Sequence, residues 1–253
     1  AFDVVAQSMG GLVGITGPVG SAGFPNGASV GDIFPGVLMA LGVVSAIHHA
    51  RATGEGQFLD VAMYDAILSL CETVVVNYSV TGKALSPRGT GHPSLCPFDV
   101  YPASDGAVAI AAPTDNHWAK LCQIIGRPEL IEDERTRSNA RRVQNREFVT
   151  DVVARWTSAR TKHEIVAALG GSVPVGPANT AAEIFADPHV AARAMLAEIQ
   201  LPGNNPAMSV VGTPIKFAAT PAGVYRRPPL LGEHTEEVLA EAGISDRAKE
   251  KQP

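Results

Sequence analysis

Asp32 is the carboxylate whose place in the sequence best suits chemistry. It follows an uncharged, glycine-rich segment, residues 14–31, and precedes an apolar run from Ile33 to Ala50. Asp is a favoured N-cap and Pro35 is tolerated in a first turn, so we expect a helix to begin at Asp32. The helix dipole would keep the carboxylate ionised, and free N–H groups there could stabilise an oxyanion. The side chain is then either a nucleophile or an ordinary cap, and the local pattern alone favours the cap.

A second candidate is the loop Arg88 to Ser94, which contains Gly89, Thr90 and Gly91. Two glycines separated by one residue allow close approach of a backbone to a ligand, or a hinge. The loop has neither the strand and helix of a dinucleotide fingerprint nor the ending of a phosphate loop, so a flexible interdomain connection is the favoured interpretation.

Metal and disulfide chemistry have little support in the sequence. Cys71, Cys96 and Cys122 are widely separated, and the seven histidines show no HxH or HxxxH spacing. We therefore expect reduced thiols, no metal and no prosthetic group, as in a cytoplasmic protein.

Composition and net charge limit the kinds of partner that we expect this protein to bind. The 253 residues are 45% hydrophobic and 18% charged, enough for one large or two small domains, and the net charge is −5. Binding to nucleic acid or to an anionic membrane rests on clustered Lys and Arg, so we expect neither. The apolar stretch from Ile33 to Ile47 contains Pro35 and falls short of the roughly 20 residues that span a bilayer, so we expect a buried helix. The opening Ala1-Phe2-Asp3 resembles no signal peptide and is typical of an internal start.

Periodicity and turn formers predict the elements that would position these residues. The expected helices are 2–12, 32–53, 62–80, 116–125, 135–161, 162–169, 180–186, 188–195 and 235–242. The expected strands are 57–61, 98–101, 108–112 and 210–217, with an extended segment at 221–229. The polar, Gly- and Pro-rich segment 82–97 marks a domain boundary.

Several short motifs, each loose alone, occur in a specific order. They are Ala1-Phe2-Asp3-Val4-Val5-Ala6-Gln7, Gly10-Gly11, Gly31-Asp32, Thr53-Gly54-Glu55-Gly56-Gln57, Asp60-Val61-Ala62-Met63-Tyr64-Asp65-Ala66, Gly89-Thr90-Gly91-His92-Pro93, Val175-Gly176-Pro177, Asp187-Pro188, Gly212-Thr213-Pro214-Ile215-Lys216-Phe217 and Pro229-Leu230-Leu231-Gly232-Glu233-His234-Thr235. Together they resemble the class III (CaiB/BaiF) coenzyme A transferase family, in its carboxyl-terminal portion. The resemblance reverses the preference at Asp32 in favour of a nucleophile.

The resemblance implies an enzyme that transfers coenzyme A from an acyl-CoA to a carboxylic acid, through anhydride and thioester intermediates on Asp32. It also implies a mobile loop at Gly89, Thr90 and Gly91, and coenzyme A contacts at Phe2 and Asp3. A related branch, the 2-methylacyl-CoA racemases, has a His where this chain has Phe2, which cannot exchange a proton. A racemase or CoA-linked isomerase, and a catalytically idle acyl-CoA-binding subunit, remain alternatives.

By the same resemblance the fold is α/β and the protein is an interlocked homodimer. Residues 1–84 would belong to an open, Rossmann-like large domain, and 85–97 would form the glycine loop and linker. Residues 98–217 would form a small α/β domain, and 218–253 an extended tail and helix that return to the large domain.

Overall fold

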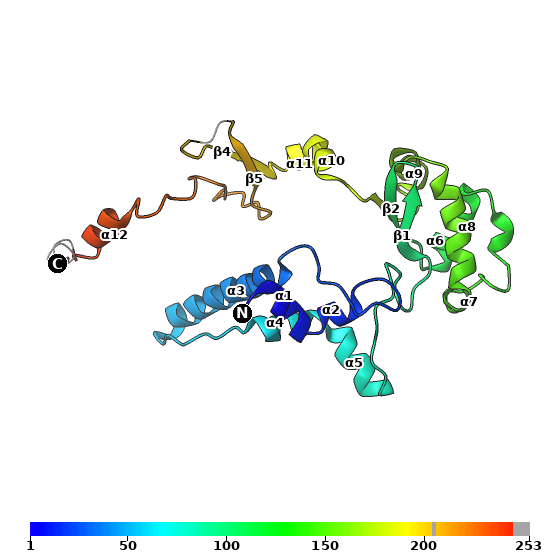
Figure 1. Cartoon of the computed structure of the whole chain (residues 1–253), viewed down its shortest axis with the longest axis horizontal. Helices are drawn as coiled ribbons and strands as arrows, with labels where there is room; N and C mark the ends of the chain where they lie inside the picture. The colour runs from blue at the N-terminus through cyan, green and yellow to red at the C-terminus, as the bar shows by residue number, and fades with distance from the viewer. Residues whose placement is uncertain (204–205, 245–253) are drawn as a thin grey trace. The chain divides into compact units, whose positions relative to one another are not determined.

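The computed structural model describes residues 1–203 and 206–244. Its contacts divide the chain into two compact units, Ala1–Ala178 and Asn179–Pro253, which are described separately here (Figure 1). The fold is mixed α/β, as expected. The domain boundaries given above stay a prediction.

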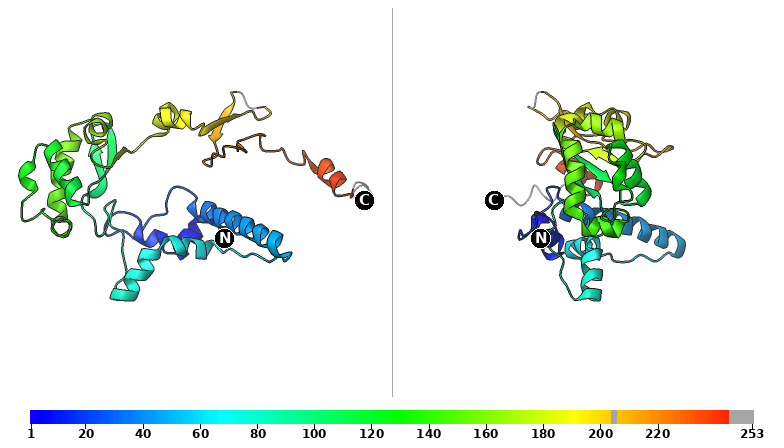
Figure 2. Two further views of the ribbon diagram at one scale, coloured as in Figure 1. Left: turned by 180° about the vertical axis from the view of Figure 1, so that it is seen from behind. Right: turned by 90° about the vertical axis from the view of Figure 1, so that its right-hand side faces the viewer.

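All elements described between residues 1 and 84 are helices. They are α1 (Asp3–Met9), α2 (Leu12–Ile15), α3 (Val30–Thr53), α4 (Met63–Leu70) and α5 (Glu72–Thr81). Helix α1 packs against both α3 and α4, and α3 runs beside α4 (Figure 2). Ala6 of α1 and Ala66 and Ile67 of α4 are buried at this junction, which fixes α1 over the amino end of α3.

Four local predictions in this region are wrong. The helix expected over 2–12 ends at Met9, because Gly10 and Gly11 separate it from the short helix that begins at Leu12. Helix α3 begins at Val30, so Asp32 lies in its first turn and is not its N-cap. The expected helix 62–80 is two helices separated at Cys71. Residues 57–61 alternate in hydropathy, but they form no strand, because none of the described strands pairs with them and a strand needs a partner.

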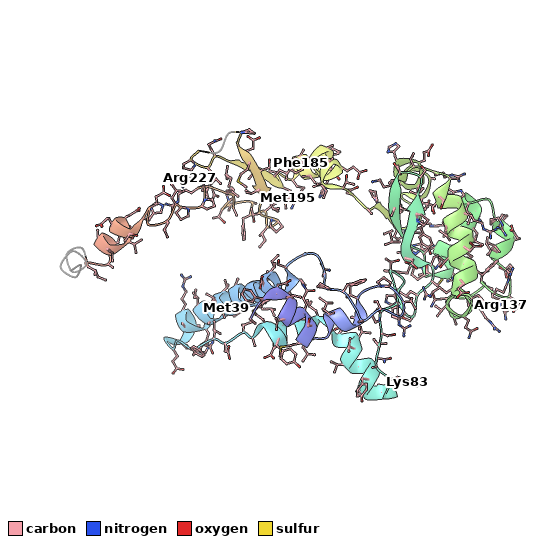
Figure 3. The ribbon with its side chains drawn as sticks, in the orientation of Figure 1. Met39, Lys83, Arg137, Phe185, Met195 and Arg227 are labelled. Atoms are coloured by element: carbon pink, nitrogen blue, oxygen red, sulfur yellow. The ribbon has the colours of Figure 1, made fainter. Side chains whose placement is uncertain are left out.

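Helix α3 is also less buried than its apolar sequence predicted. Only Gly31 and Pro35 are buried, and Ile33, Val37, Leu41 and Val44 are among its exposed residues. Figure 3 shows side chains standing along this helix, with Met39 labelled. By length and composition α3 could cross a membrane, and a single helix of this kind is weak evidence for a span.

The rest of the first unit is a small α/β body. Strands β1 (Phe98–Ala103), β2 (Gly106–Ala111) and β3 (Val175–Pro177) form an antiparallel sheet in that order. The two strands expected over 98–101 and 108–112 are confirmed with slightly different bounds, and they form a hairpin in which Ala103 pairs with Gly106.

Helices cover one face of this sheet and complete its core. They are α6 (Asp115–Ile124), the 3₁₀ helix η1 (Pro128–Leu130), α7 (Asn139–Gln144), α8 (Arg146–Ser158) and α9 (Lys162–Leu169). Tyr101, Trp118 and Leu121 are among the fully buried side chains. The expected helix 135–161 is divided at Asn145, whereas α9 has its expected bounds because Thr161 and Glu164 form a capping box.

The second unit contains α10 (Ala181–Ala186), α11 (Pro188–Ala192), β4 (Leu196–Ile199), β5 (Met208–Val211) and α12 (Thr235–Glu241). The strand predicted over 210–217 is largely wrong: β5 shares only residues 210 and 211 with it, because the antiparallel partner β4 has four residues and its pairing ends at Val211. Strands β3 and β4 were not predicted.

The three cysteines lie in the interior of the protein. Cys71, Cys96 and Cys122 are free and buried, and burial raises the pKa of Cys122 to about 12. Among residues 1–203 and 206–244, no group of three His, Cys, Asp or Glu side chains could hold a metal ion.

Candidate active site

Asp32 presents a free carboxylate at the amino end of α3. It is the third residue of the helix and is exposed. Within the described parts of the chain, its carboxylate makes no hydrogen bond and no ion pair. A side chain of this kind can approach an electrophile without first breaking an interaction inside the protein.

The backbone around Asp32 differs from expectation in one respect. The N–H groups of Val30, Asp32 and Ile33 donate to carbonyls of residues 28 and 29, at 2.7, 3.1 and 2.9 Å. The N–H of Gly31 donates to Asp3 Oδ1 at 2.7 Å. Because all four donors are occupied, the first turn of α3 does not offer the free oxyanion donors that the sequence suggested.

Phe2 and Asp3 have contrasting surroundings. The Phe2 side chain is 81% exposed immediately before α1. The Asp3 side chain is half-buried, and its carboxylate is bonded to the Gly31 N–H and to the amide of Gln7. A hydrogen bond therefore joins Asp3 to Gly31, the residue that directly precedes Asp32. The sequence analysis did not single out Gln7, because nothing in the neighbouring sequence indicates that a polar residue within a short helix is buried.

The Gly89–Gly91 loop is attached to its surroundings at several points. The Gly89 N–H donates to the carbonyl of Gly17, in the segment between α2 and α3, at 2.8 Å. The Thr90 hydroxyl donates to Asp99 Oδ1, on β1. This loop therefore contacts both the segment that leads to Asp32 and the small sheet.

Arg146 fixes the carboxyl end of the same loop. Its Nη2 donates to the carbonyls of His92 and Leu95, at 2.6 and 3.1 Å, and the His92 N–H donates to the Phe98 carbonyl at 3.0 Å. Asp99 and Arg146 were also not singled out in the sequence, because their partners lie on other elements.

A shallow groove borders this loop on the face of the sheet opposite the buried side chains of Tyr101 and Val108. It has a volume of about 380 Å³, and its lining includes Thr90, Asp99, Val100, Ala109 and Gly176. Most of its lining is apolar, and Asp99 is its charged residue. In the part of the chain that the structure describes, no hydrogen bond joins Asp32 to Gly89, Thr90 or Gly91.

Comparisons with known proteins agree on one family. The family model described as CoA-transferase family III matches residues 1–235. A succinyl-CoA:mesaconate CoA-transferase of Haloarcula marismortui is 42% identical over 244 residues, covering 96% of this chain and 61% of that protein. A succinate–glutarate CoA-transferase of Agrobacterium fabrum is 32% identical over 247 residues, covering 97% of this chain and 62% of that protein.

A solved structure agrees. The crystal structure of a CaiB/BaiF family protein from Brucella suis matches with a TM-score of 0.78 and 32% identity, over 95% of this chain and 62% of that one. The chain thus spans about three fifths of the length of the relatives it matches.

Proposed function

Because the chain belongs to CoA-transferase family III, we propose that it carries the nucleophile of a coenzyme A transferase, and that this nucleophile is Asp32. The observation that supports this role best is the exposed, unpartnered carboxylate of Asp32 in the first turn of α3. The reaction moves coenzyme A from an acyl-CoA donor to a carboxylic acid acceptor.

The proposed reaction begins when an Asp32 oxygen attacks the thioester carbonyl. The C–S bond breaks, coenzyme A leaves as a thiolate, and a mixed anhydride joins Asp32 to the donor acyl group. The thiolate then attacks the Asp32 carbonyl carbon, which releases the donor acid and leaves an aspartyl-CoA thioester. Dividing the exchange into smaller steps is the advantage of covalent catalysis.

The acceptor acid then reverses the sequence. Its carboxylate attacks the aspartyl thioester, giving a second mixed anhydride and free thiolate. The thiolate attacks the acceptor's carbonyl carbon, and the products are the new acyl-CoA and the free Asp32 carboxylate. Every step exchanges a carboxylate and a thiolate at an acyl carbon, so the chemistry needs no prosthetic group.

The printed names of the relatives guide the choice of substrates. Those proteins are named for succinyl-CoA with mesaconate, and for succinate with glutarate. We therefore propose dicarboxylic acids as the class to test, with succinyl-CoA as donor.

Several further parts of the proposal follow from the family. The Gly89–Gly91 loop, whose Gly89 N–H is bonded to the segment before α3, would close over the intermediate by analogy with the family. Phe2, which is exposed, would contact coenzyme A. The working enzyme would be an interlocked homodimer in the cytoplasm.

Trapping the intermediate tests the role of Asp32. The intact protein is mixed with succinyl-CoA and hydroxylamine, and the modified residue is located by mass spectrometry. We expect a hydroxamate at Asp32, and loss of transfer in Asp32→Ala and Asp32→Asn. Transfer at the native rate by Asp32→Ala contradicts the proposal.

Two other outcomes point to the alternatives. Exchange of the α-proton of a 2-methylacyl-CoA in deuterated water, without transfer between acids, indicates a racemase. Tight binding of acyl-CoA without either reaction indicates an idle binding subunit.

A further inference from the structure

The amino end of α3 is capped by a residue distant in sequence. Ser29, at the N-cap position, makes no side-chain capping bond. Asp3 performs that role instead, because its Oδ1 accepts the Gly31 N–H at 2.7 Å. Gly31 directly precedes Asp32, so the cap acts on the peptide that carries the nucleophile.

Gln7 holds the Asp3 carboxylate in this place. Its Nε2 lies 2.9 and 2.8 Å from the two oxygens of Asp3, one helical turn earlier on α1. Its Oε1 accepts the Asn26 N–H at 2.8 Å. The side chain is 0% exposed, and a buried amide that is fully bonded fixes its neighbours in one arrangement.

The backbone at Gly31 is packed closely against α1. A Cβ atom there would lie 2.8 Å from both the carbonyl oxygen and Oδ1 of Asp3, and 3.2 Å from the Cβ of Ala6. Only glycine permits this approach. Helix α1, the segment after α2 and the first turn of α3 are therefore joined at one point, immediately before Asp32.

We propose that Asp3 and Gln7 are positioning residues that fix the first turn of α3 and, through it, the direction of the Asp32 carboxylate. This inference rests on the proposed function of Asp32. It differs from the coenzyme A contact suggested for Asp3 by resemblance, since both oxygens of Asp3 already accept hydrogen bonds inside the chain.

Steady-state kinetics of the intact protein, with succinyl-CoA and glutarate as substrates, distinguish a positioning role of Asp3 from a role in binding coenzyme A. Asp3→Asn keeps the size of the side chain but places an amide against the amide of Gln7. We expect kcat to fall by about 10-fold or more, because small displacements of a reacting group are costly, while KM for succinyl-CoA stays within about 2-fold. A rise in KM at unchanged kcat overturns the proposal in favour of a coenzyme A contact.

A double-mutant cycle tests whether the two residues act together. Gln7→Met removes the amide at similar size, and the double variant with Asp3→Asn should lose little more kcat than the worse single variant. If the losses in kcat of the two single variants multiply in the double variant, the two residues act independently and the coupling is overturned. Ser8→Ala is the matched control, since Ser8 lies beside Gln7 on the exposed side of α1 and its hydroxyl donates to the Val4 carbonyl within the same helix.

Hydrogen–deuterium exchange of a peptide covering residues 28–34 provides a readout that does not depend on turnover. Asp3→Asn should increase exchange there, and Ser8→Ala should not. The proposal requires both faster exchange and lower kcat, and either change without the other overturns it. Its failure is distinct from failure of the proposed function, because Asp32→Ala alone decides the latter.

Discussion

The N–H of Gly89 donates to the carbonyl oxygen of Gly17 at 2.8 Å. This bond connects the loop after α5 to the segment that leads into α3, which are far apart in the sequence. Because the bond is made by backbone atoms, its formation depends on the paths of the two loops and not on either side chain. Side chains that shape the Gly89–Gly91 loop should therefore influence catalysis even where they do not touch substrate.

Thr90→Val tests the attachment of this loop to the sheet. The substitution keeps the shape of the side chain but removes the hydroxyl that donates to Asp99, leaving Asp99 with the Val100 N–H at 2.8 Å. We expect kcat for coenzyme A transfer to fall by about 10-fold, because the loop loses its preferred position. The free energy of unfolding should change by only about 1 kcal/mol, since the bond is exposed.

Thr90→Ser is the matched control, because it retains the hydroxyl and should keep most of the activity. Equal kcat in Thr90→Val and the unmodified enzyme would show that the bond to Asp99 does not position the loop.

Gly91→Ala tests how closely the loop approaches β1. A Cβ at this position would lie 2.8 Å from Asp99 Oδ2 and 3.2 Å from Arg146 Nη1. We expect a loss of no more than about 1 kcal/mol in the free energy of unfolding, measured in urea, since the obstructing atoms are the ends of the Asp99 and Arg146 side chains, which can move aside without a shift of the backbone. The loss should be smaller in an Asp99→Ala background, where the obstructing oxygen is absent.

Gly56→Ala is the control for this series, because no atom of residues 1–203 or 206–244 lies within 4 Å of a Cβ at Gly56. If Gly91→Ala costs no more than Gly56→Ala, then the close approach has no energetic consequence.

Elements with local signals were predicted well from the sequence. The strands of the β1–β2 hairpin and the helix α9 were predicted close to their observed bounds, and α9 is closed at its start by a local capping box whose two members are three residues apart. The start of α3 was predicted two residues late, because Asp32 has the local pattern of a cap. The actual cap, Asp3, is a tertiary contact that no pattern within one window reveals.

The residues of the candidate site also fall into two groups, those that sequence motifs indicate and those that only a tertiary contact reveals. Asp32 and the Gly89–Gly91 loop are recognisable from motifs in order along the chain. Gln7, Asp99 and Arg146 are not, because each is defined by a hydrogen bond to another element. Exposure of α3 was also not predictable, since an apolar sequence indicates a helix suited to burial but does not identify what packs against it.

The ion pair between Arg227 and Glu233 predicts a pH dependence in the second unit; Arg227 is labelled in Figure 3. The Arg227 guanidinium and the Leu230 N–H hold the pKa of Glu233 down to about 2. An unfolded Glu titrates near 4.3, so the pair contributes stability that is complete above roughly pH 4.3 and is lost as the pH falls towards 2.

An NMR titration of the Glu233 carboxyl measures this directly. Arg227→Gln should return its pKa towards the ordinary value, whereas Arg226→Gln, a change at the exposed neighbour, should not. An unchanged Glu233 pKa in Arg227→Gln would contradict the assignment.

Arg142→Met is expected to be the most destabilising of these changes. The Arg142 side chain is 0% exposed, and its guanidinium donates to the carbonyls of Cys96, Thr136 and Pro113 at 2.8, 2.8 and 2.7 Å. It also bonds to Asp115 at 3.0 Å. Methionine fills much of the volume but leaves buried carbonyl groups without donors, so we expect a loss of about 3–5 kcal/mol in the free energy of unfolding.

Urea unfolding followed by circular dichroism measures that loss, with Arg141→Met as the matched control. Arg141 is exposed on the same helix, α7, and its replacement should change stability by no more than about 0.5 kcal/mol. Arg142→Lys should lie between the two, because an ammonium retains the charge but cannot reach three separate carbonyls with the geometry of a guanidinium. Similar stability of Arg142→Met and Arg141→Met would show that the carbonyls find other donors, and that Arg142 does not hold the loop before β1 to α6 and α7.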